Sequence, residues 1–288
     1  MPFSIPGSGW SEIVRRYFRN RNFLIGFVIS SIIVTGALIS LGYTPYDPTS
    51  MDIHHRLEGP SYTHWLGTDH YGRDVFSRIM QGAVNSIIVG MVAVSIGMGF
   101  GVFLGSIAGY SRGIPDEAIM RLSDLLYGFP AVLSAILITS VFGPGIINSM
   151  VAIGIFYIPI FARLTRASSL SVWERDYITA ARAAGRTDSS TMFRHVLPNI
   201  MAPLIVQGTI QFAVAILAEA GLSYLGLGTQ PPQASWGLML QEAQTFMGTS
   251  PGLAIFPGLA IALAVLGFNL LGDGLRDTLD PKLIQARR

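Results

Sequence analysis

Long apolar stretches separated by short charged segments are the main feature of this sequence. No Asp, Glu, Lys or Arg occurs within five stretches, which cover residues 79–111, 125–162, 195–218, 220–241 and 243–272. Because a helix of roughly 20 apolar residues crosses the hydrocarbon core of a bilayer, each stretch is long enough to form a span. The pattern therefore predicts a polytopic membrane protein.

Turn-forming residues divide these stretches into six predicted spans. The Gly143-Pro144-Gly145 triplet breaks the longest stretch, and the Thr229-Gln230-Pro231-Pro232 cluster separates the last two spans. The first apolar run follows several arginines and is too long for the apolar region of a secretory signal peptide, so we expect it to be retained. The predicted spans are residues 23–42, 85–110, 123–142, 146–164, 201–222 and 251–271.

Composition narrows the functions that such a bundle can have. Half of the residues are hydrophobic and 12% are charged, which excludes a soluble enzyme. The absence of cysteine excludes disulfides, thiolate nucleophiles and Cys-ligated metal centres. The single lysine, Lys282, lies in a polar tail, so the chain has no phosphate-binding loop, and any ATP is hydrolysed by another chain. A net charge of +2 does not indicate binding to nucleic acid.

The distribution of basic residues predicts the orientation of the bundle. If the N-terminus is cytoplasmic, 16 of the 19 Lys and Arg residues lie on the cytoplasmic side, as the positive-inside rule requires. The exceptions, Arg56, Arg73 and Arg78, lie in one loop. We therefore expect both termini inside. The predicted parts are a cytoplasmic segment (1–22), the first transmembrane helix (23–42), an extracytoplasmic loop (43–84), a five-helix core (85–272) and a cytoplasmic tail (273–288).

The segment 166–199 is far longer than the 2–8 residues that join neighbouring helices, so it is expected to carry a function. Trp173, Tyr177, Ala181 and Ala184 recur at helical spacing and predict one face of an amphipathic helix. Gly185 then provides a helix stop, and Thr187 or Asp188 can cap a second short helix before Pro198. The pattern predicts a helix-turn-helix along the membrane surface, with small side chains where another protein can approach.

Part of this segment resembles a known family signature. Ala180-Ala181, Gly185 and Leu197-Pro198 are similar to the E-A-A-x-x-x-G-x9-I-x-L-P signature of permease subunits of ABC importers, with Thr179 in place of the Glu and His195 in place of the Ile. Three further motifs resemble the dipeptide, oligopeptide and nickel branch, and specifically its "C" type permease, over nearly the whole chain. These motifs are LGTDHYGRDVFSR (66–78), EAGLSYLGLG (219–228) and FNLLGDGLRD (268–277).

The resemblance implies an all-α type I ABC importer fold with six transmembrane helices, in the bacterial cytoplasmic (inner) membrane. It implies a non-catalytic subunit that carries no cofactor, because ATP and Mg bind to partner subunits. The implied partners are a second homologous permease, two cytosolic ABC ATPases and an extracytoplasmic solute-binding protein. The solute is peptide-like, within a range that includes glutathione, nickel complexes, opines and oligosaccharides. The implied coupling residues are Trp173, Tyr177, Ala180, Ala181, Arg182, Gly185, Asp188, Leu197 and Pro198.

Polar residues inside the fifth span form a candidate solute path. Glu219 is the only acid inside a predicted span, near its outer end, where we expect water to reach it. Gln207 and Gln211 lie one turn apart on the same helix, and Glu219 lies close to their face. These three residues are candidates for the translocation path. Hydrogen bonding to neighbouring helices is the alternative interpretation.

The loop 43–84 contains four histidines and several acids, but their spacing matches no metal motif, so no metal site is predicted. Instead we expect Arg73 to pair with an acid and Asp74 to cap the next helix. The loop is slightly acidic and is a candidate contact for the binding protein.

The sequence argues against two other functions. An ion-coupled secondary transporter usually needs several ionisable groups near the membrane centre, and the predicted spans contain no such group there. An intramembrane hydrolase needs a nucleophile with a base inside the membrane, and the predicted spans contain no such pair.

Overall fold

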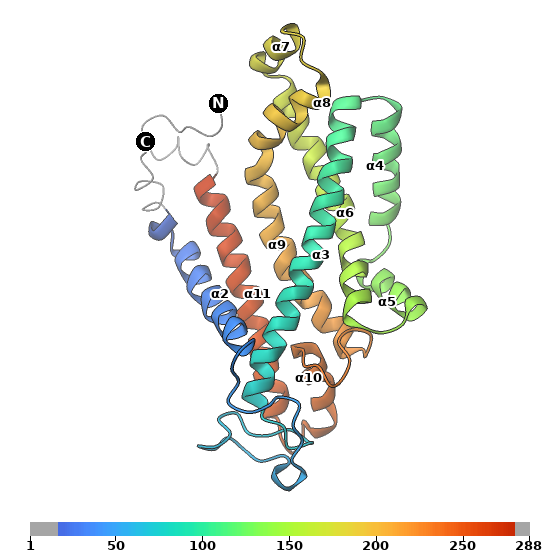
Figure 1. Cartoon of the computed structure of the whole chain (residues 1–288). Helices are drawn as coiled ribbons and strands as arrows, with labels where there is room; N and C mark the ends of the chain where they lie inside the picture. Colours follow the sequence, from blue (N-terminus) through green and yellow to red (C-terminus); the bar gives the residue numbers. More distant parts are fainter. Residues whose placement is uncertain (1–16, 280–288) are drawn as a thin grey trace.

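The computed structural model describes residues 17–279, which form a bundle of long helices with no β-strand in this range (Figure 1). Residues 1–16 of the predicted N-terminal segment and 280–288 of the predicted tail lie outside the described residues. The helices are α2 (Arg21–Ser40), α3 (Val75–Ser111), α4 (Ile114–Tyr127), α5 (Ala131–Phe142), α6 (Ile146–Trp173), α7 (Asp176–Ala183), α8 (Asp188–Thr191), α9 (Leu197–Tyr224), α10 (Trp236–Ala243) and α11 (Gly252–Leu279). Three short helical turns lie at Ile53–His55, Met192–Val196 and Gln244–Phe246.

Five described helices are long and apolar enough to cross a membrane, and the α4–α5 pair makes a sixth if it counts as one span. Helices α4, α7 and α8 gather at one end of the bundle, the α7 end, whereas α10 and the loop 41–74 lie at the other, the α10 end (Figure 1). The predicted turn at Gly143-Pro144-Gly145 is present between α5 and α6. The predicted all-helical, six-span architecture is therefore confirmed in outline.

The third predicted span, 123–142, is not one straight helix. Helix α4 ends at Tyr127, and α5 begins at Ala131 with a bend of 86° between them. Pro130 explains the break, because a proline has no backbone N–H to donate and forces the preceding residue out of the α-helical region. Helix α4 starts before the predicted span and is amphipathic, and its Asp116 pairs with Arg166 of α6. The third span is thus an amphipathic helix joined to an apolar one at a sharp bend.

Several helices extend beyond their predicted apolar spans. Helix α3 starts at Val75, ten residues before the predicted 85, because Asp74 caps it by accepting a hydrogen bond from the Ser77 N–H at 2.8 Å. The predicted loop 43–84 is shorter by the same residues. Helix α6 runs to Trp173 and α11 to Leu279, past the predicted ends at 164 and 271. Hydropathy reports only the part of a helix that lies in lipid, so it misses such extensions.

Helices α3 and α6 pack closely along much of their length. A Cβ atom added at Gly97 would lie 2.3 Å from the Tyr157 Cβ, and one at Gly101 would lie 2.6 Å from the Ile158 carbonyl oxygen. Gly105 faces the backbone of Ala162 in the same way. The four-residue spacing puts these glycines on one face of α3, as in other close helix contacts in membranes. The Gly-rich stretch of the predicted second span is therefore a packing surface.

We predict that Gly101→Leu destabilises the bundle and that Gly99→Leu does not. Nothing lies within 4 Å of a Cβ added at Gly99, whereas one at Gly101 meets backbone that cannot turn away. Overpacking of this kind costs about 1–3 kcal/mol. The thermal unfolding midpoint of the purified protein in detergent should fall for Gly101→Leu. Equal midpoints for the two variants would contradict the α3–α6 packing.

Candidate functional site

Helix α6 carries the predicted coupling segment at its end. It is followed by a two-residue break, and α7 begins at Asp176. The prediction of one helix from Trp173 to Ala184 is wrong, because Trp173 ends α6, where it is buried, and α7 starts at Asp176. The Trp173 ring lies 5.6 Å from the Arg182 guanidinium carbon, so it supports α7 from beneath. The periodicity was misleading because the helix breaks between the two residues.

Helix α7 is fixed by one residue that the sequence pattern did not single out. Ile178 is fully buried and belongs to the core formed with α3, α6 and α9. Tyr177 and Ala180 are exposed, and Ala181, one turn after Ile178, is half-buried. Because Ile178 alone is buried in α7 and most of the other side chains are exposed, the surface of this helix is available to another protein.

The turn after α7 requires glycine, as predicted. Gly185 has a φ of +83°, the left-handed region, and its N–H donates to the Arg182 carbonyl at 2.9 Å. Thr187 caps α8 through its side chain, which accepts from the Ser190 N–H. Asp188 instead pairs with Arg182, with 2.9 Å between Oδ1 and Nε. The α7–α8 hairpin, residues 176–191, is thus closed by a glycine turn and an exposed ion pair.

The end of the predicted signature lies at the start of α9. Leu197 and Pro198 occupy the first turn of α9. A π-helical turn, Met192–Val196, joins α8 to α9 without a loop. The hairpin is therefore held between two long helices, α6 and α9.

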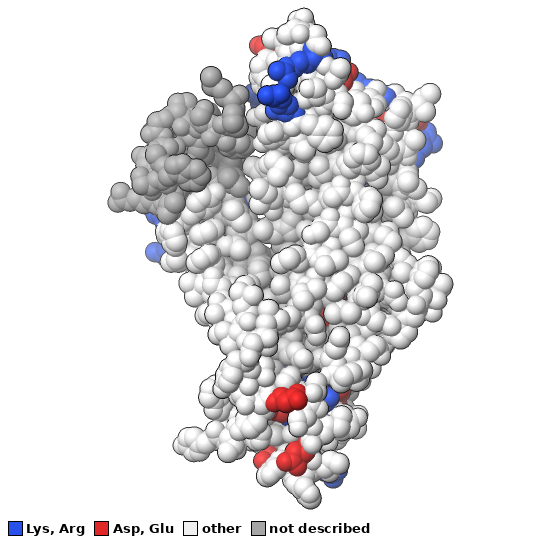
Figure 2. All heavy atoms as spheres, viewed as in Figure 1, with Lys and Arg blue, Asp and Glu red and all other residues white. Residues whose placement is uncertain are grey.

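Basic residues gather over the hairpin. Figure 2 shows Lys and Arg at the α7 end and acidic side chains at the α10 end of the viewed face. The exposed arginines of this segment are Arg175, Arg182, Arg186 and Arg194. The two ends of the molecule thus differ in charge as the sequence predicted.

Glu219 is not accessible to water, contrary to the expectation for this residue. It is fully buried, and its carboxylate accepts hydrogen bonds from Ser86 of α3 at 3.0 Å and Ser223 of α9 at 2.6 Å. Thr229, in the loop after α9, donates a third at 3.2 Å. The loop folds back over the end of α9 and covers the carboxylate, which a helical projection could not show. Glu219 therefore braces this loop against α3 and α9.

The two glutamines of the predicted path differ in their surroundings. Gln211 is buried at 8% exposure, and Gln207 is half-buried. Both lie on α9, but Gln207 is closer to the α7 end. Gln207 is therefore partly accessible, whereas Glu219, farther along the same helix, is fully buried.

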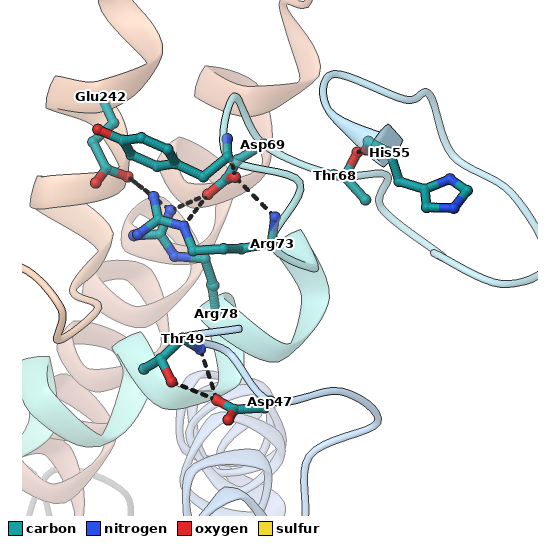
Figure 3. Close-up of polar contacts among 9 residues, drawn as sticks. Asp47, Thr49, His55, Thr68, Asp69, Arg73, Arg78 and Glu242 are labelled. Carbon is teal, nitrogen blue, oxygen red and sulfur yellow. Dashed lines mark hydrogen bonds and ion pairs between the residues drawn. The ribbon is translucent and has the colours of Figure 1, made fainter. Parts of the chain in front are cut away.

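A buried ion cluster ties the loop 41–74 to α10 (Figure 3). Arg73 Nε donates to Asp69 Oδ2 at 2.7 Å, and Arg73 Nη2 donates to Glu242 Oε2 at 3.0 Å. Arg78 Nη1 reaches the same two oxygens at 2.5 and 2.7 Å. The expectation that Arg73 pairs with an acid is confirmed, and Glu242 is the member that sequence spacing could not identify.

The charges of this cluster compensate each other. Burial alone would raise the pKa of Asp69, but Arg78 and Arg73, together with backbone N–H donors, lower it below the ordinary value of 3.8. Burial lowers the pKa of His70, so this imidazole adds no positive charge near neutral pH. Two guanidinium groups and two carboxylates make a neutral, mutually bonded set.

The same cluster resembles a metal site only in its residue types. Ligand atoms of Asp69, His70 and Glu242 lie within 4.8 Å of one another. Both carboxylates are already bonded to Arg73 and Arg78, and a divalent cation there would add an uncompensated buried charge. We therefore assign the cluster as an ion-pair clamp between the loop and α10.

Comparison with known proteins identifies the class. The family described as "Binding-protein-dependent transport system inner membrane component" matches residues 101–285, and the N-terminal transmembrane domain of oligopeptide transport permease C matches residues 8–60. The chain belongs to this family of transporter membrane components. It is therefore a non-catalytic, multi-pass inner-membrane subunit that works with an ATPase and a binding protein, and the ion-coupled alternative is excluded.

Individual proteins of this family are similar to the chain over most of its length. The chain is 44% identical to the glutathione transport system permease protein GsiD of Pectobacterium atrosepticum, over 95% of this chain and 91% of that protein. It is 42% identical to the dipeptide transport system permease protein DppC of Alkalihalophilus pseudofirmus, over 96% of this chain and 91% of that protein. Among solved structures, the MetNI methionine ABC transporter in an inward-facing conformation matches with a TM-score of 0.59 at 16% identity, over 70% of this chain and 96% of that one. This last similarity supports the fold.

We predict that Asp69→Asn destabilises the protein at neutral pH, because it leaves two buried guanidinium groups with one carboxylate. Breaking a buried pair in this way costs about 3–5 kcal/mol. The folded-state pKa of Asp69 is lowered, so its stabilisation is present above about pH 4 and is lost as the pH falls through that lowered value. The unfolding midpoints of the parent and the variant should therefore converge below pH 4.

Asp47→Asn is the matched control, because this exposed carboxylate bonds only to nearby residues of its own turn. A pH-independent difference between Asp69→Asn and the parent protein would show that the ion pairs are not its source.

Proposed function

We propose that this chain is one of two homologous permease subunits of an ATP-driven importer of peptides or peptide-like solutes. The complex would contain a second permease, two ATPases that bind ATP and Mg, and a binding protein that delivers the solute. The substrate class is supported by the relatives, which are named for glutathione and dipeptide transport. The observation that carries the proposal is the exposed α7–α8 hairpin at the end of α6.

The orientation follows from charge. The α7 end carries Arg175, Arg182, Arg186 and Arg194, and the positive-inside rule favours the cytoplasm for such a segment. The α10 end, with the loop 41–74, then faces outward and meets the binding protein. Both termini would be cytoplasmic.

Coupling would pass from the ATPase through α7 into α6. Helix α6 is continuous from Ile146 to Trp173, so it can move as a rigid body. Two ion pairs attach α4 to it, between Arg166 and Asp116 and between Arg163 and Asp124, the latter at 2.7 Å. A displacement of the hairpin would therefore also move α4 and the bend that leads to α5.

The solute path would run along α9 past Gln207 and Gln211. The buried brace formed by Glu219 with Ser86, Ser223 and Thr229 supports a different role for that acid, which is to position the loop at the outer mouth of the path.

The coupling role is tested at Gly185 and Ala181. A β-branched residue at a φ of +83° is strained, so Gly185→Val should distort the hairpin, and Ala181→Trp should block close approach of the ATPase. Solute-stimulated ATP hydrolysis by the reconstituted complex should fall several-fold for both variants, with normal membrane insertion.

Gly248→Val is the control for that experiment, because Gly248 is exposed at the α10 end, has open space around it and lacks a positive φ. Full coupling in both hairpin variants would remove the assignment of residues 166–199 as the coupling segment.

The orientation is tested with single cysteines, since the chain contains none. Ser50→Cys should react with a membrane-impermeant maleimide in intact cells, and Ser189→Cys should react only after permeabilisation. Labelling of Ser189→Cys in intact cells would invert the proposed topology.

A further inference from the structure

Helix α5 is a short apolar helix with one side uncovered in the described part of the chain. It contains 12 residues, which make it about 18 Å long, and a bend of 86° separates it from α4. Because about 20 residues are needed to cross the hydrocarbon core, α5 alone does not span the membrane. Figure 1 shows α5 level with the middle of α2, a candidate span of 20 residues, so both ends of α5 lie at membrane depth.

The two sides of α5 differ in side-chain size and in burial. Ala135 and Thr139, one turn apart, are buried, and Ala135 belongs to the core shared with α6 and α9. Leu133, Leu137 and Val141 recur every four residues on the opposite side and are between 62% and 71% exposed. Small side chains thus face the rest of the chain, whereas these three large apolar side chains form an uncovered surface, the α5 stripe.

Lipid does not suit the start of α5. Gly128, Phe129 and Pro130 are non-helical and exposed, and Pro130, at the N-cap of α5, makes no side-chain hydrogen bond to the first turn. The first N–H groups of a helix have no acceptor within the helix. Hydrocarbon cannot accept hydrogen bonds from them, so non-helical backbone at membrane depth lies against protein or lines a water-filled cavity. The uncovered side of α5 therefore does not face the bilayer.

Water does not suit the α5 stripe either. A water-filled cavity would leave Leu133, Leu137 and Val141 hydrated, whereas contact with protein would bury their apolar surface, which is favourable. The stripe therefore calls for protein from another chain. Of the proposed partners, the ATPases are cytosolic and the binding protein lies outside the membrane, so only the second permease shares the bilayer with α5.

We infer that the α5 stripe packs against the second permease subunit in the middle of the membrane. The inference rests on the proposed function, which supplies that subunit. The contact covers the large apolar side chains of α5 and places protein beside the exposed backbone of residues 128–130. Because the ion pair between Arg163 and Asp124 attaches α4 to α6, a movement of the α7–α8 hairpin would reach this interface through α4.

The inference is tested with nitroxide spin labels on the reconstituted complex, whose other subunits carry no reactive cysteine. Leu137→Cys is labelled, and its collisions with oxygen, which concentrates in lipid, and with a water-soluble nickel chelate are measured by electron paramagnetic resonance. Ile32→Cys is the matched control, because Ile32 is apolar and exposed on α2, at the opposite edge of the bundle (Figure 1). Oxygen accessibility should be several-fold lower at residue 137 than at residue 32, with little nickel accessibility. High oxygen accessibility at residue 137 would place the stripe in lipid and high nickel accessibility would place it in water, and either result would overturn the inference.

A crosslink identifies the subunit that covers the stripe. Leu137→Cys, modified with a maleimide photo-crosslinker in the purified complex, should give a covalent product with the second permease, and Ile32→Cys should not. A product that joins two copies of this chain, or equal products from the two variants, would overturn the inference. Purification of an active complex without any second permease would contradict the proposed function itself, whereas co-purification of that subunit without a product from Leu137→Cys would contradict only the α5 interface.

Discussion

The approach of α3 to α6 is the contact on which the rest of the molecule depends. Neither helix gains hydrophobic energy by leaving lipid for its neighbour, so close backbone packing at Gly97, Gly101 and Gly105 has to hold them together. Helix α3 extends at one end to the ion clamp, and α6 extends at the other to the α7–α8 hairpin. The glycine contact therefore connects the two faces of the membrane mechanically.

Polar groups are used differently at the two ends. At the α10 end they are buried and paired, as in the clamp of Asp69 with Arg73 and in the brace around Glu219. At the α7 end the ion pairs are partly exposed, as between Arg182 and Asp188, and they contribute little stability. In the proposed orientation, this contrast suits a subunit whose α10 end receives the binding protein and whose α7 end moves against the ATPase.

The sequence predicted the span count, the turn at Gly143-Pro144-Gly145, the left-handed Gly185 and the Asp74 cap, because each depends on local backbone chemistry. It did not predict the break before Pro130, because the residues around this proline are apolar and read as one continuous span. It also did not predict where the long helices end. It also missed Glu242 and the loop that covers Glu219, because these contacts join residues far apart in the chain. It also missed that Trp173 is buried at the end of α6 and that Ile178 anchors α7, because a two-residue break between the helices shifts the helical phase.

The most direct test of the central claim, that the α7–α8 hairpin contacts the ATPase, is proximity. Ala180→Cys, the only cysteine of its chain, would be modified with a maleimide photo-crosslinker in the purified complex and irradiated. The hairpin assignment predicts a covalent product between this chain and an ATPase subunit, with none from Thr249→Cys at the α10 end. The absence of an ATPase product from Ala180→Cys in an active complex would contradict it.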